Sequence, residues 1–294
     1  MGNAFLALHL SILLAGWTGV FGKLIELTPV MIVFWRVVIG GAIMLCVVNM
    51  SHTFERCTPK ERVQYLLLGA FLAYQWMLFY AGIKASNISI GVVSFSTLGF
   101  FTAIFEPLLN KKRIALHEIG FSLLTVAGIA LIFHFDSRYR LGIIFGTLSA
   151  AGAALIAIYM KAFRRSHNSQ TVLTWQFCGA FLGTALLLPF YFYFVPDTAF
   201  FPKLWPDVPY LVIFATVVTL GMYWLQMVAL SHVSAFTVNL SYNLEPVYSI
   251  AIAILFLGEA RELNSSFWAG LGLIALSVVL QTIVVIKKQK EAHA

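Results

Sequence analysis

Long apolar runs follow one another along nearly the whole chain, separated by short polar stretches. An α-helix rises 1.5 Å per residue, so about 20 apolar residues cross the hydrocarbon core of a bilayer. Ten segments meet this requirement, and we predict one membrane-spanning helix in each. The segments are residues 3–22, 29–50, 62–83, 89–109, 117–134, 141–162, 170–194, 208–230, 234–257 and 265–286. The pattern therefore predicts an all-α integral membrane protein with ten transmembrane helices.

Lysine and arginine predict the orientation of these helices. With the N-terminus in the cytoplasm, twelve basic residues lie in the predicted inner loops and the C-terminal tail, and six lie in the outer loops. Membrane proteins carry an excess of Lys and Arg in their cytoplasmic loops. We therefore predict that both the N- and C-termini are cytoplasmic.

The two halves of the chain are weakly similar to one another. The segment AYQWMLFYAG matches LGMYWLQMVA, which pairs Trp76 with Trp224, and FWRVVIGGA matches TWQFCGA. Since the matches keep the same order, we predict two five-helix repeats, residues 1–136 and residues 137–294, the second ending in a short basic cytoplasmic tail. Five is an odd number, so the second repeat is inverted in the membrane. Many secondary transporters have this architecture, with the substrate site between the repeats near the midplane.

The composition agrees with the membrane assignment and limits the partners. Hydrophobic residues make up 60% of the chain and charged residues 11%, whereas about 25% of the residues of a soluble domain are charged. The net charge of +7 does not indicate nucleic acid, because the basic residues lie in short loops that orient the chain. The three cysteines, Cys46, Cys57 and Cys178, have no spacing typical of a disulfide framework or a zinc site. We predict no metal and no cofactor.

Arg36 is the one charge in an apolar run from Pro29 to Val48, and Gln176 occupies the matching position of the second repeat. The two positions are equivalent on opposite sides of the membrane, so a charge on one side makes the two access routes electrostatically different. A charge at this depth costs at least ~2.5 kcal/mol and should face a partner or a wet cavity. Arg36 is therefore either an anion contact in a substrate cavity or a structural arginine bonded to backbone carbonyls or a carboxylate.

Glu245 lies close to the midplane of its predicted span and precedes Pro246. Proline removes a backbone donor and kinks a helix, so freed carbonyls beside a carboxylate would suit a cation or an ammonium group. The alternative is a salt bridge between Glu245 and Arg36 that fixes helix packing. Glu106 lies near a cytoplasmic helix end beside the sequence NKKR, and we expect an interfacial ion pair there.

Aromatic and amide side chains gather in the third and eighth spans, and more polar residues precede Glu245 in the ninth. Aromatic residues with polar tips suit a site that holds an apolar body and orients it through a few polar groups. Ordinary interhelical packing remains the alternative for each of them. The predicted substrate-binding residues are Arg36, Tyr74, Trp76, Tyr80, Ser96, Trp175, Gln176, Tyr223, Trp224, Gln226, Asn239, Tyr242, Asn243 and Glu245.

Two sequence patterns carry a family resemblance. They contain, in chain order, Trp17, Lys23, Pro29 and Arg36 in the first two spans, and Pro246, Gly258, Glu259 and Gly270 in the last two. These patterns resemble the signatures of the drug/metabolite transporter (DMT) superfamily, EamA type. The resemblance implies ten helices in two repeats and a transport function. That family includes exporters of amino acids and other metabolites, riboflavin transporters and carriers of activated metabolites. The chain departs from the pattern in the fourth span, where proline comes at Pro107, about eight residues late.

These features favour a secondary transporter of the bacterial inner membrane, a multi-pass protein that acts by alternating access about a midplane cavity. Export of a small amphipathic metabolite, an amino acid or a related compound, is the leading hypothesis. Import of a vitamin or metabolite on the same fold is the alternative. A membrane-embedded enzyme is disfavoured because no Asp lies in a span and no HExxH motif occurs. The expected partners are a small-molecule substrate, protons as a candidate coupling ion, and the lipid bilayer, for a monomer or a homodimer.

Overall fold

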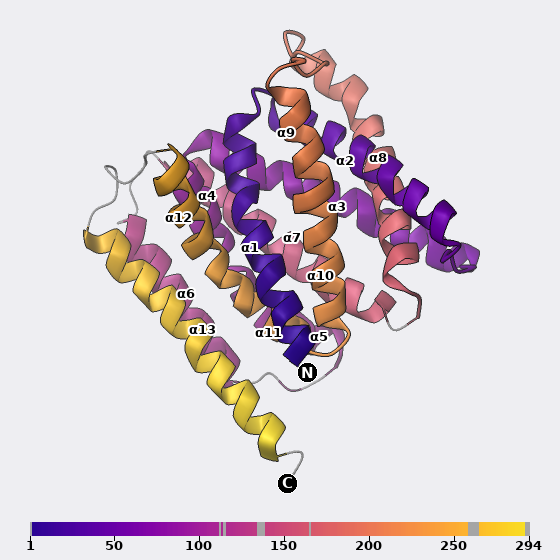
Figure 1. The fold of residues 1–294 in the computed structure, drawn as a ribbon. Coiled ribbons are helices and arrows are strands. Elements are labelled where there is room, and N and C mark those ends of the chain that lie inside the picture. The colour runs from indigo at the N-terminus through magenta and orange to yellow at the C-terminus, as the bar shows by residue number, and fades with distance from the viewer. Residues whose placement is uncertain are drawn as a thin grey trace.

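The computed structural model describes residues 2–111, 113, 116–133, 139–164, 166–257 and 265–291, and no strand occurs among them. The all-α prediction is confirmed for this part of the chain (Figure 1). The elements are α1 (Gly2–Leu24), α2 (Pro29–Ser51), α3 (Pro59–Ala85), α4 (Ile88–Phe95), α5 (Leu98–Leu109), α6 (Leu116–Phe133), α7 (Arg140–Arg164), α8 (Ser169–Phe194), α9 (Asp207–Ile213), the π-helix η2 (Phe214–Leu220), α10 (Gly221–Leu230), α11 (Ala235–Ser241), the 3-10 helix η3 (Tyr242–Leu244), α12 (Glu245–Leu257) and α13 (Ser265–Glu291).

Seven of the described helical stretches are long and apolar enough to cross a membrane. They are Ala4–Leu24, Pro29–Ser51, Pro59–Ala85, Ile88–Leu109, Arg140–Arg164, Ser169–Phe194 and Asp207–Leu230. Shorter apolar helices, Ile119–Leu131 and Trp268–Ser277, lie in two further predicted spans. The protein therefore crosses the membrane several times, and the count of ten crossings stays a prediction.

The sequence explains where several helices begin. Thr58 precedes Pro59, whose missing N–H is not needed in the first turn of α3. The Thr58 hydroxyl accepts a hydrogen bond from the Glu61 backbone N–H (3.3 Å), and the Glu61 carboxylate accepts one from the Thr58 N–H (2.8 Å). This reciprocal pair satisfies two donors that a helix start leaves free. Asn87 and Asn168 start α4 and α8 in the same way, each accepting a bond from the N–H three residues later.

The fourth and ninth predicted spans are not continuous helices; the sequence predicts an irregularity at Pro246 in the ninth but none in the fourth. The fourth breaks between Phe95 and Leu98, and the ninth passes through η3 just before Pro246. The first break needs no proline, because the Thr97 hydroxyl donates to the Ser94 carbonyl (2.9 Å) and local side-chain bonds compete with the helix. Broken helices of this kind form the substrate sites of many transporters.

Helices from the two predicted repeats pack against each other rather than forming separate halves. α3 packs on α7 and α8, α1 packs on α10 and α12, and α6 lies beside α13 along one edge of the molecule (Figure 1). The α3–α8 contact is very close: a Cβ on Gly69 would lie 1.9 Å from the Gln176 backbone oxygen, and one on Gly179 would lie 2.0 Å from the Leu66 oxygen. Only glycine fits at these two positions. The boundary between the predicted repeats, residues 136 and 137, lies outside the described residues.

Candidate functional site

A cavity of about 60 Å³ lies in the centre of the helices. Its polar lining comes from both halves of the chain: Thr18, Arg36, Gln75 and Trp76 from the first, and Tyr223, Gln226, Asn239, Tyr242 and Glu245 from the second. A cavity of this size has room for a few water molecules. The walls between the polar groups are apolar and aromatic, as in small-molecule sites.

Arg36 is 1% exposed and lies between two aromatic rings. Its guanidinium carbon is 3.8 Å from the centre of the Trp76 ring and 4.3 Å from that of the Phe214 ring. Its Nε donates to the Thr219 hydroxyl (2.6 Å) and its Nη1 donates to the Tyr80 hydroxyl (2.5 Å), while Nη2 has no partner among the described residues. Ring faces and neutral hydroxyls stabilise the cation without neutralising it. Arg36 therefore keeps an unused donor and an uncompensated positive charge.

The π-helix η2 holds two of these Arg36 contacts. The Thr219 hydroxyl donates to the Phe214 carbonyl five residues earlier (2.7 Å) and accepts the bond from Arg36 Nε. The wider π turn thereby presents Phe214 and Thr219 to the same guanidinium. Short π segments are rare and are frequent at functional sites. The sequence carries no clear signal for this element, and sequence reasoning missed both residues.

Glu245 is 4% exposed, begins α12 and lines the same cavity as Arg36. The described side chains form no ion pair between Glu245 and Arg36, so the alternative of a direct salt bridge is absent from this structure. A buried basic group and a buried acidic group thus line one cavity without forming an ion pair.

Aromatic hydroxyls and amides join the elements around the cavity. Trp76 Nε1 donates to the Tyr223 hydroxyl (3.0 Å), which links α3 to α10. The Tyr242 hydroxyl donates to Ser11 on α1 (3.1 Å). Gln75 Nε2 donates to the Ser149 hydroxyl (2.6 Å). Gln75 belongs to the aromatic and amide stretch that the sequence singles out, but it was not among the predicted site residues.

The structure brings half of the fourteen predicted site residues to the cavity. Those in its lining are Arg36, Trp76, Tyr223, Gln226, Asn239, Tyr242 and Glu245. Tyr80 contacts it indirectly, through the bond to Arg36. The side chain of Asn243 lies outside the described part of the structure.

The other five predicted residues lie elsewhere. Tyr74 and Trp224 are 38% and 37% exposed on the surface of the helix bundle. The Ser96 hydroxyl donates a hydrogen bond to the Val92 carbonyl at the break between α4 and α5. Trp175 packs on Phe54, with ring centres 5.9 Å apart, and Gln176 is buried at the α3–α8 contact. A one-residue step along a helix turns a side chain by about 100°, so neighbours such as Tyr223 and Trp224 face different surroundings.

Polar contacts also join neighbouring elements toward both ends of the helices. At the end where α8 leads into α9, Lys203 forms an ion pair with Glu26, and Asp207 accepts a bond from the Glu26 N–H (3.0 Å). At the opposite end, Glu106 accepts a bond from the Phe236 N–H (2.8 Å) at the start of α11. Asn239 Nδ2 donates to Thr102 nearby (2.9 Å). The ion pair expected for Glu106 near NKKR stays a prediction, because Lys112 lies outside the described residues.

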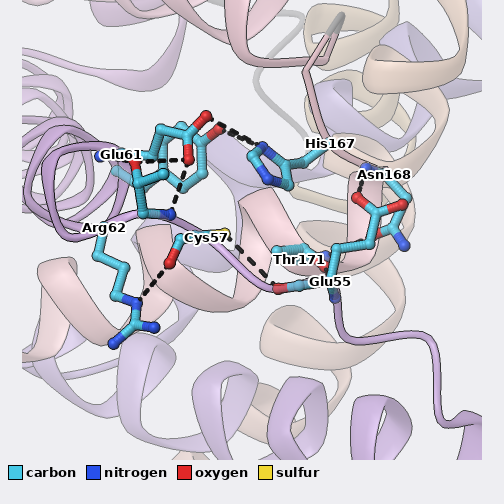
Figure 2. Close-up of polar contacts among 9 residues, drawn as sticks. Glu55, Cys57, Glu61, Arg62, His167, Asn168 and Thr171 are labelled. Atoms are coloured by element: carbon cyan, nitrogen blue, oxygen red, sulfur yellow. Dashed lines mark hydrogen bonds and ion pairs between the residues drawn. The ribbon is translucent and has the colours of Figure 1, made fainter.

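A second polar cluster joins the loop after α2 to the start of α8 (Figure 2). The Asn168 N–H donates to the Glu55 carboxylate (2.6 Å), and the Glu55 N–H donates to the Thr171 hydroxyl (2.9 Å). The Cys57 thiol contacts the Glu55 carbonyl, and burial raises the pKa of this thiol. These hydrogen bonds connect the loop after α2 to the start of α8 and so link the two halves of the chain.

Comparison with known proteins identifies the family of this chain. A search of curated proteins finds no match. Among solved structures, 29 chains match; one, described only as "Crystal structure of protein", has a TM-score of 0.71 and 17% sequence identity over 96% of this chain and 98% of that chain. At this identity the likeness shows the fold alone. The EamA-like transporter family matches residues 3–134 and 140–283. The chain belongs to the EamA-like transporter family.

Membership of the EamA-like transporter family confirms the resemblance to the DMT superfamily and gives the cavity its context. The protein is a membrane transporter and not an enzyme. Among the described residues, no group of three or more His, Cys, Asp or Glu side chains is placed to hold a metal ion. In an EamA-like transporter, a central cavity lined by buried ionisable side chains is the natural candidate for the site that binds the transported molecule.

Proposed function

We propose that this EamA-like transporter is a secondary transporter of the bacterial inner membrane that exports a small amphipathic metabolite, an amino acid or a related compound. One observation carries the proposal: Arg36, a base, and Glu245, an acid, are both buried, form no ion pair with each other, and line the same cavity. Burying an unpaired charge is costly. A ligand that carries both an anionic and a cationic group would satisfy both residues at once.

We propose a role for each part of the site. The free Nη2 of Arg36 would donate to a carboxylate, and Glu245 would accept from an ammonium group. The Trp76 and Tyr223 rings would enclose the apolar body of the ligand. Protons are the proposed coupling ion, with Glu245 as the group that exchanges them.

We propose alternating access, and the small cavity and the polar contacts toward both ends of the helices support it. A cavity of about 60 Å³ holds water molecules but not a metabolite, so binding requires a wider conformation. We propose that the contacts of Glu26 with Lys203 and Asp207 open on one side, and those of Glu106 and Asn239 on the other. The fixed α3–α8 contact would stay in place while the surrounding helices move.

The proposed topology has ten spans in two inverted repeats, residues 1–136 and 137–294, with both termini in the cytoplasm. Its support is the surplus of basic residues in the predicted inner loops and the breaks in both the fourth and the ninth spans. Equivalent breaks in two repeats are typical of transporters whose site lies between them.

The experiment is flux in proteoliposomes with a panel of labelled amino acids and metabolites, with and without a pH gradient. Arg36→Gln and Glu245→Gln are compared with Trp224→Phe, a matched control outside the cavity. We expect saturable flux that both cavity variants reduce at least about tenfold, the effect of losing one charged hydrogen bond, and that the control retains. If Arg36→Gln and Glu245→Gln transport as well as the control, the cavity charges do not bind the substrate. Saturable flux of a molecule without an anionic group would contradict the role given to Arg36.

A further inference from the structure

A second cavity, of about 370 Å³, lies where α7 ends and α10 turns toward α11. It is lined by Lys161, Arg164, Leu230, Ser231, His232 and Val233, and it shares no lining residue with the central cavity. Figure 1 shows α10 and α11 meeting at the end of the molecule opposite α9. In the proposed topology this is the cytoplasmic end.

The ionisable groups in this lining are all bases. Lys161 and Arg164 are three residues apart in the last turn of α7, so their side chains lie on one face of the helix. His232 comes from the turn after α10. No Asp or Glu is among the lining residues. The cavity therefore presents a positive field and no internal counter-charge.

Lys161 and Arg164 are engaged differently. Lys161 Nζ donates to the Val233 carbonyl (2.8 Å) in the turn that follows α10. A positive charge is favourable near the C-terminal end of a helix. Arg164 forms no hydrogen bond or ion pair with the described part of the chain, and its Nε is buried without a partner. A buried charged donor without an acceptor is energetically unfavourable. Helix-end electrostatics account for a positive charge at both residues, but they supply no acceptor for Arg164 Nε.

We infer that this cavity binds a phosphate group, either the phosphodiester of an anionic lipid headgroup or free phosphate. A phosphate oxygen supplies the acceptor that Arg164 Nε lacks, and arginine matches the geometry of phosphate oxygens with paired N–H groups. Ser231 and His232, which contact the Val228 carbonyl and each other, also line the cavity. Basic pockets between membrane helices on the cytoplasmic side hold the headgroups of anionic lipids, and this position at the helix ends is within reach of such headgroups.

The test measures the melting temperature of the purified full chain in detergent. The probes are phosphatidylglycerol, phosphatidylcholine, and inorganic phosphate against chloride at equal ionic strength. Arg164→Gln is compared with Arg56→Gln, which removes an exposed arginine from the loop after α2, outside the cavity. We expect phosphatidylglycerol or inorganic phosphate to stabilise the wild-type protein. Arg164→Gln should bind about fivefold more weakly, the contribution of one basic residue near an anionic headgroup, and Arg56→Gln should bind normally.

The separate probes distinguish the two sources of the phosphate. Stabilisation by phosphatidylglycerol alone identifies a lipid site, and stabilisation by inorganic phosphate as well identifies a site for free phosphate. Equal shifts in melting temperature for wild type and Arg164→Gln would overturn the inference. It would also be overturned if the wild-type melting temperature were the same in phosphatidylglycerol as in phosphatidylcholine and the same in phosphate as in chloride. If Arg164→Gln does not fold, Arg164→Lys tests the same point, because it keeps the charge but lacks the Nε–H, and unchanged binding would then overturn the inference.

Discussion

At the scale of single residues, Arg36 shows how a membrane protein can bury a charge without cancelling it. The rings of Trp76 and Phe214 cover the guanidinium. The Thr219 and Tyr80 hydroxyls accept hydrogen bonds from its Nε and Nη1. None of these partners carries a negative charge at neutral pH. The residue is held rigidly while Nη2 stays free. This arrangement would suit the proposed contact with a ligand anion, since little reorganisation of Arg36 would be needed.

Replacing Arg36 by lysine tests whether the shape of the cation matters. Lysine keeps the charge but offers a compact ammonium that cannot bond Thr219, Tyr80 and a ligand with the same planar geometry. We expect Arg36→Lys to fold but to transport at least about tenfold more slowly at low substrate concentration, the size of one lost charged hydrogen bond. The initial rate of flux in proteoliposomes measures the effect, with Trp224→Phe as the control. Wild-type rates in Arg36→Lys would show that only the charge is needed.

At the scale of the elements, the sequence predicts the helices better than the breaks within them. Pro246 indicates the irregular turn at η3, because proline disrupts the helix before it. The break at Ser96 and Thr97 has no such marker, since it depends on side-chain bonds back to the chain. The π-helix η2 carries no local signature and is visible only through its contact with Arg36.

The candidate site was also predictable only in part: the sequence indicates its charged residues, but helix packing decides which aromatic residues face the cavity. Arg36 and Glu245 were predictable because charges are rare in membrane spans. Which of the neighbouring aromatic residues faces inward was not, since Tyr223 lines the cavity and Trp224 faces outward on the same helix. Both surfaces of such a helix are apolar in a membrane, so the usual polar outer face that would reveal the orientation is absent.

The α3–α8 contact gives a prediction about stability. A Cβ at Gly69 or Gly179 would lie 1.9 Å or 2.0 Å from a backbone oxygen of the facing helix, so alanine forces the helices apart. We expect Gly69→Ala and Gly179→Ala each to destabilise the protein by about 1–3 kcal/mol, as overpacking does. Gly120→Ala and Gly272→Ala are matched controls, because a Cβ at either position meets nothing within 4 Å. Melting temperatures in detergent measure the difference, and equal values for all four variants would refute the close contact.

At the scale of the whole molecule, the number of crossings decides whether the two halves are inverted. An inverted repeat requires an odd number of spans in each half. Seven of the described helices meet the length and hydropathy expected of a span, and the apolar part of α6 is shorter, Ile119–Leu131. Whether α6 crosses the membrane therefore determines whether the second half enters from the opposite side.

Two exposed loop positions separate these possibilities. Arg56 follows α2 and Asp197 follows α8, and the stretches between them are α3, α4 with α5, α6, α7 and α8. If α6 crosses, five spans lie between the positions and they face opposite sides of the membrane; if it does not, four spans lie between them and they face the same side. In a cysteine-free background, we expect an impermeant maleimide added to intact cells to label Asp197→Cys within minutes and to label Arg56→Cys only after the cells are opened. Labelling of both in intact cells, or of neither, would show that α6 does not cross, and the inverted repeat and the alternating access built on it would fall together.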